Sequence, residues 1–104
     1  MDSAQFSVTR GDHPVVTVSG EVDLYNAPEL DDCLQSLISE GHQRIDVDLQ
    51  DCTYLSSEGI SALARAALRM GAGALRMPRA HRSVLLRLHT RGLGDLVQFP
   101  DTLG

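Results

Sequence analysis

The stretch Cys52-Thr53-Tyr54-Leu55-Ser56-Ser57-Glu58-Gly59-Ile60 joins a predicted strand to a predicted helix, and the rest of the chain is organised around it. Two adjacent serines therefore lie at a helix N-terminus. Unpaired backbone N–H groups and the positive end of the helix dipole favour anions such as phosphate there. A serine in this place can cap the helix, or it can accept a phosphate that the helix end stabilises. The local sequence favours Ser56 as the cap and leaves both roles open for Ser57.

The segments after this junction alternate between helix and strand. An apolar stripe at helical spacing begins near Ser57 and is closed by Gly71. Residues 74–77 read as a short strand stopped by Pro78, and residues 80–91 as a third helix ended by Gly92. Leu96, Val97 and Phe99 predict a last short strand.

The segments before the junction begin with a hairpin. Residues 5–10 and 15–18 read as strands, residues 11–14 as the turn between them, and residues 20–24 as a segment leading out of the sheet. Asn26-Ala27-Pro28-Glu29 resembles a capping box, with Asn26 as the cap, and the helix it starts is ended by Gly41. Residues 44–49 alternate, with Ile45, Val47 and Leu49 on one side, and form the strand that enters the junction.

This order predicts an α/β fold with one mixed β-sheet and helices on one face, because strands separated by helices are most simply parallel. The length of 104 residues suits one domain. No repeat or linker divides the chain, and we expect residues 1–104 to form a single domain.

Composition excludes several classes of function. Hydrophobic residues make up 42% of the chain, as in globular proteins, and no apolar run is long enough for a membrane span. The N-terminus has no basic segment followed by an apolar one, so we expect no signal peptide and a cytoplasmic protein. The net charge of −5 argues against direct nucleic-acid binding. Cys33 and Cys52 fit free thiols in a reducing compartment, although a regulatory disulfide between them remains an alternative.

Other polar residues do not form a readable catalytic or metal-binding pattern. Asp46 and Asp48 share the face opposite Ile45, and we expect a solvated face there. Glu21 and Asp23 have no histidine or nucleophile at readable spacing, which favours charges that face a partner. Four arginines make the third helix basic: Arg79, Arg82, Arg87 and Arg91. We expect a solvated helix face, with attraction of an acidic partner or a lipid headgroup as the alternative. We therefore expect no enzyme activity and no cofactor.

The chain resembles the STAS domain, and most closely its small bacterial branch, the anti-sigma-factor antagonists. The resemblance covers about residues 5–99 and rests on the order of elements and on three motifs. These are Gly20-Glu21-Val22-Asp23-Leu24 before a helix that starts at Ala27-Pro28, the serine pair before Gly59, and Gly92-Leu93 followed by Asp95-Leu96.

In that family the turn typically reads D-S-S-G, and its first serine is the phosphoacceptor. The matching positions here are Ser56, Ser57, Glu58 and Gly59. The resemblance thus implies phosphorylation at Ser57, with Ser56 as the second choice. This sequence departs from the D-S-S-G pattern at two positions, because Ser56 replaces the acid and Glu58 replaces the second serine. The surrounding partner surface implied by the family comprises Glu21, Asp23, Tyr25, Asn26, Ser56, Ser57 and Glu58.

The resemblance implies partner switching that regulates transcription. The unmodified antagonist binds an anti-sigma factor that is also a serine kinase, and thereby frees a sigma factor. Phosphorylation from ATP breaks the complex, and a serine phosphatase resets it. The alternative within the same fold is a STAS subunit that braces the ATPase of a phospholipid-transport ABC system.

Overall fold

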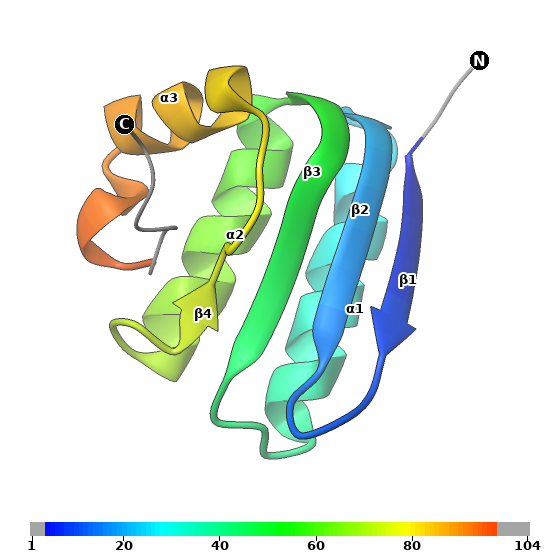
Figure 1. Cartoon of the computed structure of the whole chain (residues 1–104), viewed down its shortest axis with the longest axis vertical. Coiled ribbons are helices and arrows are strands. Elements are labelled where there is room, and N and C mark those ends of the chain that lie inside the picture. Colours follow the sequence, from blue (N-terminus) through cyan, green and yellow to red (C-terminus); the bar gives the residue numbers. More distant parts are fainter. Residues whose placement is uncertain (1–3, 98–104) are drawn as a thin grey trace.

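Four strands form one sheet in the computed structural model, which describes residues 4–97. They are β1 (Gln5–Thr9), β2 (Val15–Val22), β3 (Ile45–Leu55) and β4 (Leu75–Arg76), in the spatial order β1-β2-β3-β4. β1 and β2 pair antiparallel as a hairpin, whereas β2 with β3 and β3 with β4 are parallel. Each parallel pair is joined through a helix, as Figure 1 shows.

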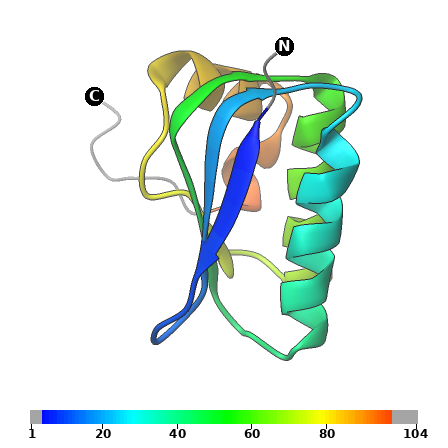
Figure 2. The same ribbon diagram turned by 90° about the vertical axis from the view of Figure 1, so that its right-hand side faces the viewer.

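The helices are α1 (Ala27–Ser39), α2 (Ser57–Met70) and α3 (Arg82–Thr90), followed by a short 3₁₀ helix, η1 (Leu93–Asp95). α1 and α2 lie side by side on one face of the sheet, and neither covers the other face (Figure 2). α3 lies beside the C-terminal end of β3, near the start of α2 (Figure 1). The expected mixed sheet with helices on one face is confirmed.

The core lies between the sheet and the two long helices. β2 and β3 contribute alternating β-branched and leucine side chains, and α1 and α2 contribute residues at helical spacing. Its fully buried members include Val16, Val18, Ile45, Val47, Leu49, Leu30, Leu34, Leu63 and Ala66. Because both helices rest on this layer, their N-termini are held at the end of the sheet where β2 and β3 finish.

The largest differences from the sequence prediction concern β2, β3 and the last predicted strand. Residues 20–22 do not lead out of the sheet but extend β2, because Gly20 adopts φ 86° at an irregularity in its pairing with β3. β3 continues to Leu55 rather than ending at residue 49. The predicted last strand is wrong for Leu96 and Val97, which form a turn and a bend after η1. Phe99, the third residue of that prediction, lies outside the described residues.

The face of the sheet without α1 and α2 carries a buried carboxylate. Asp46 is buried although a solvated face was expected, since Arg44 Nε donates to its Oδ1 at 3.0 Å and His13 Nε2 lies 3.1 Å from its Oδ2. Burial opposes the charge, but these hydrogen bonds outweigh it, so the pKa of Asp46 lies below its usual value. Its neighbour Asp48 is half-buried and pairs with Arg79 at 2.9 Å.

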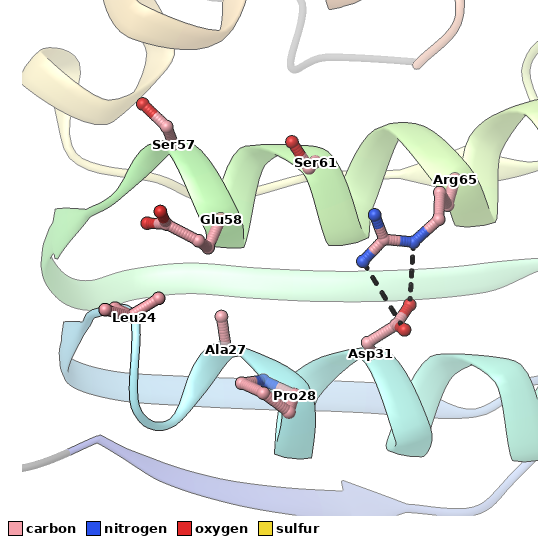
Figure 3. A pocket seen from close by; sticks show the side chains of 8 residues that line it. All are labelled: Leu24, Ala27, Pro28, Asp31, Ser57, Glu58, Ser61 and Arg65. Carbon is pink, nitrogen blue, oxygen red and sulfur yellow. Dashed lines mark hydrogen bonds and ion pairs between the residues drawn. The ribbon is translucent and has the colours of Figure 1, made fainter.

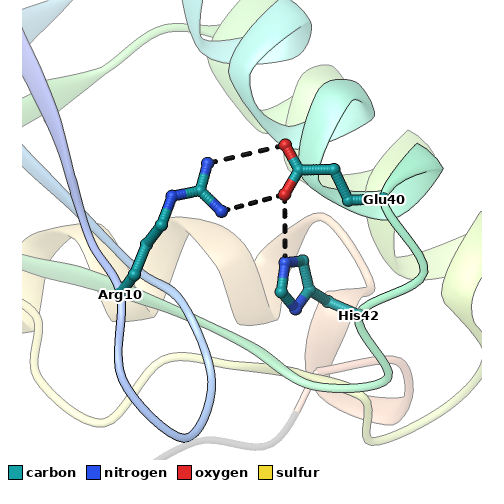
Figure 4. A network of polar contacts seen from close by, with 3 residues as sticks. All are labelled: Arg10, Glu40 and His42. Carbon is teal, nitrogen blue, oxygen red and sulfur yellow. Dashed lines mark hydrogen bonds and ion pairs between the residues drawn. The ribbon is translucent and has the colours of Figure 1, made fainter.

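The far end of the molecule is joined by a polar network on its surface (Figure 4). Arg10, after β1, donates to Glu40 Oε1 at 2.8 Å, and Glu40 follows the last residue of α1. His42 Nε2 lies 3.2 Å from the same oxygen. Hydrogen bonds from Arg10 and His42 hold the pKa of Glu40 below its usual value. The contact ties the hairpin turn to the end of α1.

The first turn of α2 packs directly on the ends of β2 and β3. A Cβ atom built on Gly59 would lie 2.7 Å from Leu55 Cδ1 and 2.8 Å from Val22 Cγ1, which is closer than carbon atoms can approach. Both contacted side chains are fully buried. The helix therefore needs glycine at this position to reach its observed depth.

We expect Gly59→Ala to lower the free energy of unfolding by about 1–2 kcal/mol, since overpacking outweighs the better helix propensity of alanine. Chemical denaturation measures this change. Ser61→Ala, at an exposed position of the same helix, is the control and should stay within about 0.5 kcal/mol of the parent. An unchanged stability for Gly59→Ala would contradict the close packing.

Asp46→Asn should remove part of the acid sensitivity of the fold. Because the pKa of Asp46 is lowered on folding, its contribution is present above the usual aspartate value of about 3.9 and is lost as pH falls through the folded value. We expect a loss of about 1 kcal/mol at pH 7 and a flatter stability profile between pH 5 and 2. Urea unfolding across that range tests it, with the exposed Asp51→Asn as control. Parallel profiles for Asp46→Asn and the parent would contradict the prediction.

Candidate functional site

Ser56 caps α2 and is buried, which confirms the prediction that it is the N-cap. Its backbone is extended, with φ −72° and ψ 170°, and its Oγ accepts a hydrogen bond from Gly59 N at 3.2 Å. Its own backbone N–H donates to Val22 O at 2.9 Å, so the cap is also tied to the end of β2. The hydroxyl of Ser56 is thus already committed to the helix and is shielded from solvent.

Ser57 is the first residue of α2, and its side chain is half-buried. Its Oγ accepts a hydrogen bond from Nη2 of the exposed Arg91 at 2.9 Å. The adjacent hydroxyls therefore have different environments, because the extended cap residue and the first helical residue direct their side chains to different sides. Of the two, the hydroxyl of Ser57 is the one that solvent and a partner can reach.

Glu58 is exposed and leaves the helix in a different direction from Ser57, as Figure 3 shows. It points toward a groove of about 380 Å³ between the first turns of α1 and α2. Arg65 and Asp31 form an ion pair at 3.4 Å across the groove. Its lining residues are Leu24, Ala27, Pro28, Asp31, Ser57, Glu58, Ser61 and Arg65.

The loop between β2 and α1 is held by its own polar side chains. Asp23 Oδ1 accepts from the backbone N–H groups of Tyr25 and Asn26 at 2.9 and 3.0 Å. Asn26 occupies the N-cap position, but its side chain makes no capping bond, so that part of the prediction was wrong. Instead Asn26 Oδ1 accepts from Asp23 N, and Nδ2 donates to Glu21 O. These bonds fix the loop from inside.

The fixed loop presents its other side chains to solvent. Tyr25 is 87% exposed and Leu24 is also exposed, although both are large and apolar. Glu21 is exposed at the end of β2, opposite Tyr54 of β3. The fold therefore brings the predicted residues of the loop and of the serine junction to the same end of the sheet, with Asp23 and Asn26 in supporting positions.

Arg87 of α3 and Arg91, the C-cap of that helix, also reach this end, and sequence reasoning expected both on a solvated face. Arg87 Nε donates to Leu55 O at 3.2 Å, and its guanidinium lies 5.7 Å from the centre of the Tyr54 ring. Arg91 contacts Ser57. The two are four residues apart and so share one face of the helix. The four-residue spacing of Arg87 and Arg91 is visible in the sequence and indicates that they share a face. It does not indicate which other element of the fold that face contacts.

Residues 4–97 contain no group of three or more His, Cys, Asp or Glu side chains that could hold a metal ion. Cys33 and Cys52 are free thiols, and burial raises the pKa of both. No helix in that part of the chain is long and apolar enough to cross a bilayer.

Comparisons with known proteins agree on the family. The model of the family described as "Mlab, STAS domain" matches residues 7–98. An anti-sigma-B factor antagonist of Staphylococcus epidermidis is 35% identical over 54 residues, which are 52% of this chain and 50% of the relative. The chain thus spans about half the length of the curated relatives it matches.

Solved structures give the same fold over nearly the whole chain. An anti-sigma factor antagonist from Mycobacterium paratuberculosis superposes with a TM-score of 0.85 and 25% identity, covering 97% of this chain and 88% of that one. The Bacillus cell fate determinant SpoIIAA in its phosphorylated form gives 0.71 at 14% identity, covering 96% and 93%. The second likeness concerns the fold alone.

Substituting the two serines separates their roles. Ser56→Ala should lower the free energy of unfolding by about 1 kcal/mol, because the cap of α2 is lost and the Gly59 N–H loses its partner. Ser57→Ala should stay within about 0.5 kcal/mol, because it removes one bond to an exposed arginine. Thermal and urea unfolding measure both. The reverse ranking would contradict the assignment of Ser56 as the cap.

Proposed function

The chain belongs to the STAS domain family, and from that premise we propose that it is an anti-sigma-factor antagonist switched off by phosphorylation of Ser57. In this proposal the unmodified protein binds a kinase-type anti-sigma factor in the cytoplasm and frees a sigma factor for transcription. It is a regulatory binding protein, acting as one domain, and not an enzyme. A serine phosphatase would restore the unmodified form.

The observation that carries the proposal is the accessible hydroxyl of Ser57 beside a surface suited to a partner. Ser57 is half-buried at the start of α2, whereas the second candidate, Ser56, is buried and used as the cap. The exposed Leu24 lines the groove that Ser57 also lines, and the exposed Tyr25 follows Leu24 in the same loop. A partner that covers these apolar side chains would also cover the hydroxyl.

The proposed modification is a phosphoryl transfer from ATP, catalysed by the partner. The Ser57 oxygen forms a bond to the terminal phosphorus, the bond from that phosphorus to the bridging oxygen breaks, and ADP leaves. The hydroxyl proton passes to a base of the kinase. Hydrolysis by the phosphatase returns the hydroxyl and releases inorganic phosphate, so the cycle consumes ATP and water.

The charge of the phosphate explains why the complex would separate. Phosphoserine adds about −1.5 to −2 charges at neutral pH, in a surface that already carries the exposed Glu21 and Glu58. Covering that charge with a partner removes it from water, and a penalty of about 2.7 kcal/mol weakens binding about a hundredfold. The helix N-terminus tolerates the phosphate within the chain, so the fold is retained.

The test uses the purified chain, a cognate anti-sigma factor and ATP. We expect one phosphate by mass spectrometry, located at Ser57 and absent from Ser57→Ala, while Ser57→Asp binds the anti-sigma factor about a hundredfold more weakly. Ser61→Ala is the matched control, since Ser61 is an exposed hydroxyl of the same helix that lines the same groove. It should be phosphorylated like the parent.

Two results would contradict the proposal. One is phosphate that persists in Ser57→Ala, which would place the acceptor elsewhere. The other is an affinity purification that recovers a transporter ATPase and no kinase-type anti-sigma factor, which would favour the transport subunit instead.

A further inference from the structure

The basic face of α3 meets the start of α2 at the proposed phosphoacceptor. Arg91 stands at the C-terminal end of α3, where a cation is favoured by the helix dipole, and Gly92 with φ 86° turns the chain away behind it. Its Nη2 lies 2.9 Å from Ser57 Oγ, across 34 residues of sequence. The contact therefore joins the C-terminal end of one helix to the N-terminal end of another.

The charge of Arg91 is not neutralised by a carboxylate in the described part of the chain. None of the ion pairs formed by residues 4–97 includes it. Glu58, the acid next to Ser57 in the sequence, points to the groove on a different side of α2 (Figure 3). A guanidinium has five N–H donors, and the hydrogen bond to Ser57 uses one of them.

Arg87 supports the same face from the preceding turn. Its Nε bond to Leu55 O and its position over the Tyr54 ring hold its guanidinium at the end of β3. Two positive charges thus stand on the side of Ser57 that faces α3, while the acids Glu21 and Glu58 stand on the surface around it. A phosphate on Ser57 would therefore have these two cations next to it on the side of α3.

We propose that Arg91 is a phosphate clamp within the chain: once Ser57 is phosphorylated, the guanidinium binds the phosphate oxygens and links α3 to the start of α2. This inference rests on the proposed function, because it describes what becomes of the modified residue. A guanidinium binds phosphate in a two-pronged geometry that a lysine cannot reproduce. Arg91 starts within hydrogen-bond distance of the modified atom, so a side-chain rotation brings its donors to the new oxygens.

The clamp gives the phosphorylated protein a contact that the unmodified protein lacks. The phosphate is held against α3, and the link adds a contact between two helices that otherwise meet through few side chains. The modified chain should therefore be more stable to heat than the unmodified one.

The experiment installs phosphoserine at position 57 during translation, so that no kinase or partner is needed. The phosphate is titrated by ³¹P NMR in the parent, in Arg91→Gln and in Arg82→Gln. Arg82 is the matched control, an exposed arginine in the first turn of the same helix. Apart from the substituted arginines, the charged or titratable groups at the ends of β2 and β3, in the loop after β2, and on α2, α3 and η1 are the same in all three proteins: Glu21, Asp23, Tyr25, Tyr54, Glu58, Arg65, Arg69, Arg87, His89 and Asp95.

We expect the second pKa of the phosphate to be lower in the parent than in Arg91→Gln by about 0.5 or more, since a nearby cation favours the dianion. Arg82→Gln should match the parent. The phosphorylated parent should also melt a few degrees above the unmodified protein, and Arg91→Gln should lose that gain. Arg91→Lys, which keeps the charge but not the fork, should fall between.

Identical titrations in the parent and Arg91→Gln, with both folded by circular dichroism, would overturn the clamp. That failure is separate from a failure of the proposed function. A chain that no anti-sigma factor binds or phosphorylates, but whose phosphate responds to Arg91→Gln, would remove the switch and keep the clamp chemistry. A chain that the anti-sigma factor phosphorylates, but whose phosphate titrates identically in the parent and in Arg91→Gln, would keep the switch and remove the clamp.

Discussion

The arrangement of the site depends on how closely α2 approaches the ends of β2 and β3. Gly59 has no side chain, and the space a methyl group would need is filled by Val22 and Leu55. The backbone hydrogen bond from Ser56 N to Val22 O also holds the start of α2 close to the end of β2. With the helix at this depth, the cap is buried, the next residue reaches the surface, and the loop after β2 lies beside it.

Charges of both signs are sorted around this point. The end of β2 and the first turn of α2 carry the exposed acids Glu21 and Glu58, whereas α3 and its C-cap supply Arg87 and Arg91. The net charge of −5 describes the chain as a whole and hides this division. A group that gains negative charge at Ser57 therefore has exposed acids on one side and two arginines on the side of α3. The acids and the arginines thus lie in different directions from Ser57.

The sequence predicted the elements whose signals are local. Apolar spacing located the helices and central strands, and Ser56 was identified as a cap because an N-cap is recognised by its position before a helix. Asn26 was misread because its side chain found partners within the loop, at Asp23 and Glu21, that compete with a cap. Residues 96–97 were misread because short apolar segments fit a strand and a turn after a 3₁₀ helix equally well.

The contacts between elements were beyond the sequence for a different reason. Asp46 looked like a surface residue because alternation assigns a face but not what covers it, and Arg44 and His13 cover it here. Arg91 looked solvated because its partner, Ser57, is 34 residues away. Such pairings follow from topology, which brings the end of α3 to the start of α2.

The edges of the sheet are unequal, and this bears on self-association. β4 contributes only Leu75 and Arg76, and Pro78 lacks the N–H that a neighbouring strand would need. β1 is the longer edge strand of the described sheet, on the side away from α3 (Figure 1). Sheet extension by a second chain would thus form at β1. Two chains joined in that way would leave the α3 side of each sheet, where Arg91 contacts Ser57, uncovered (Figure 1).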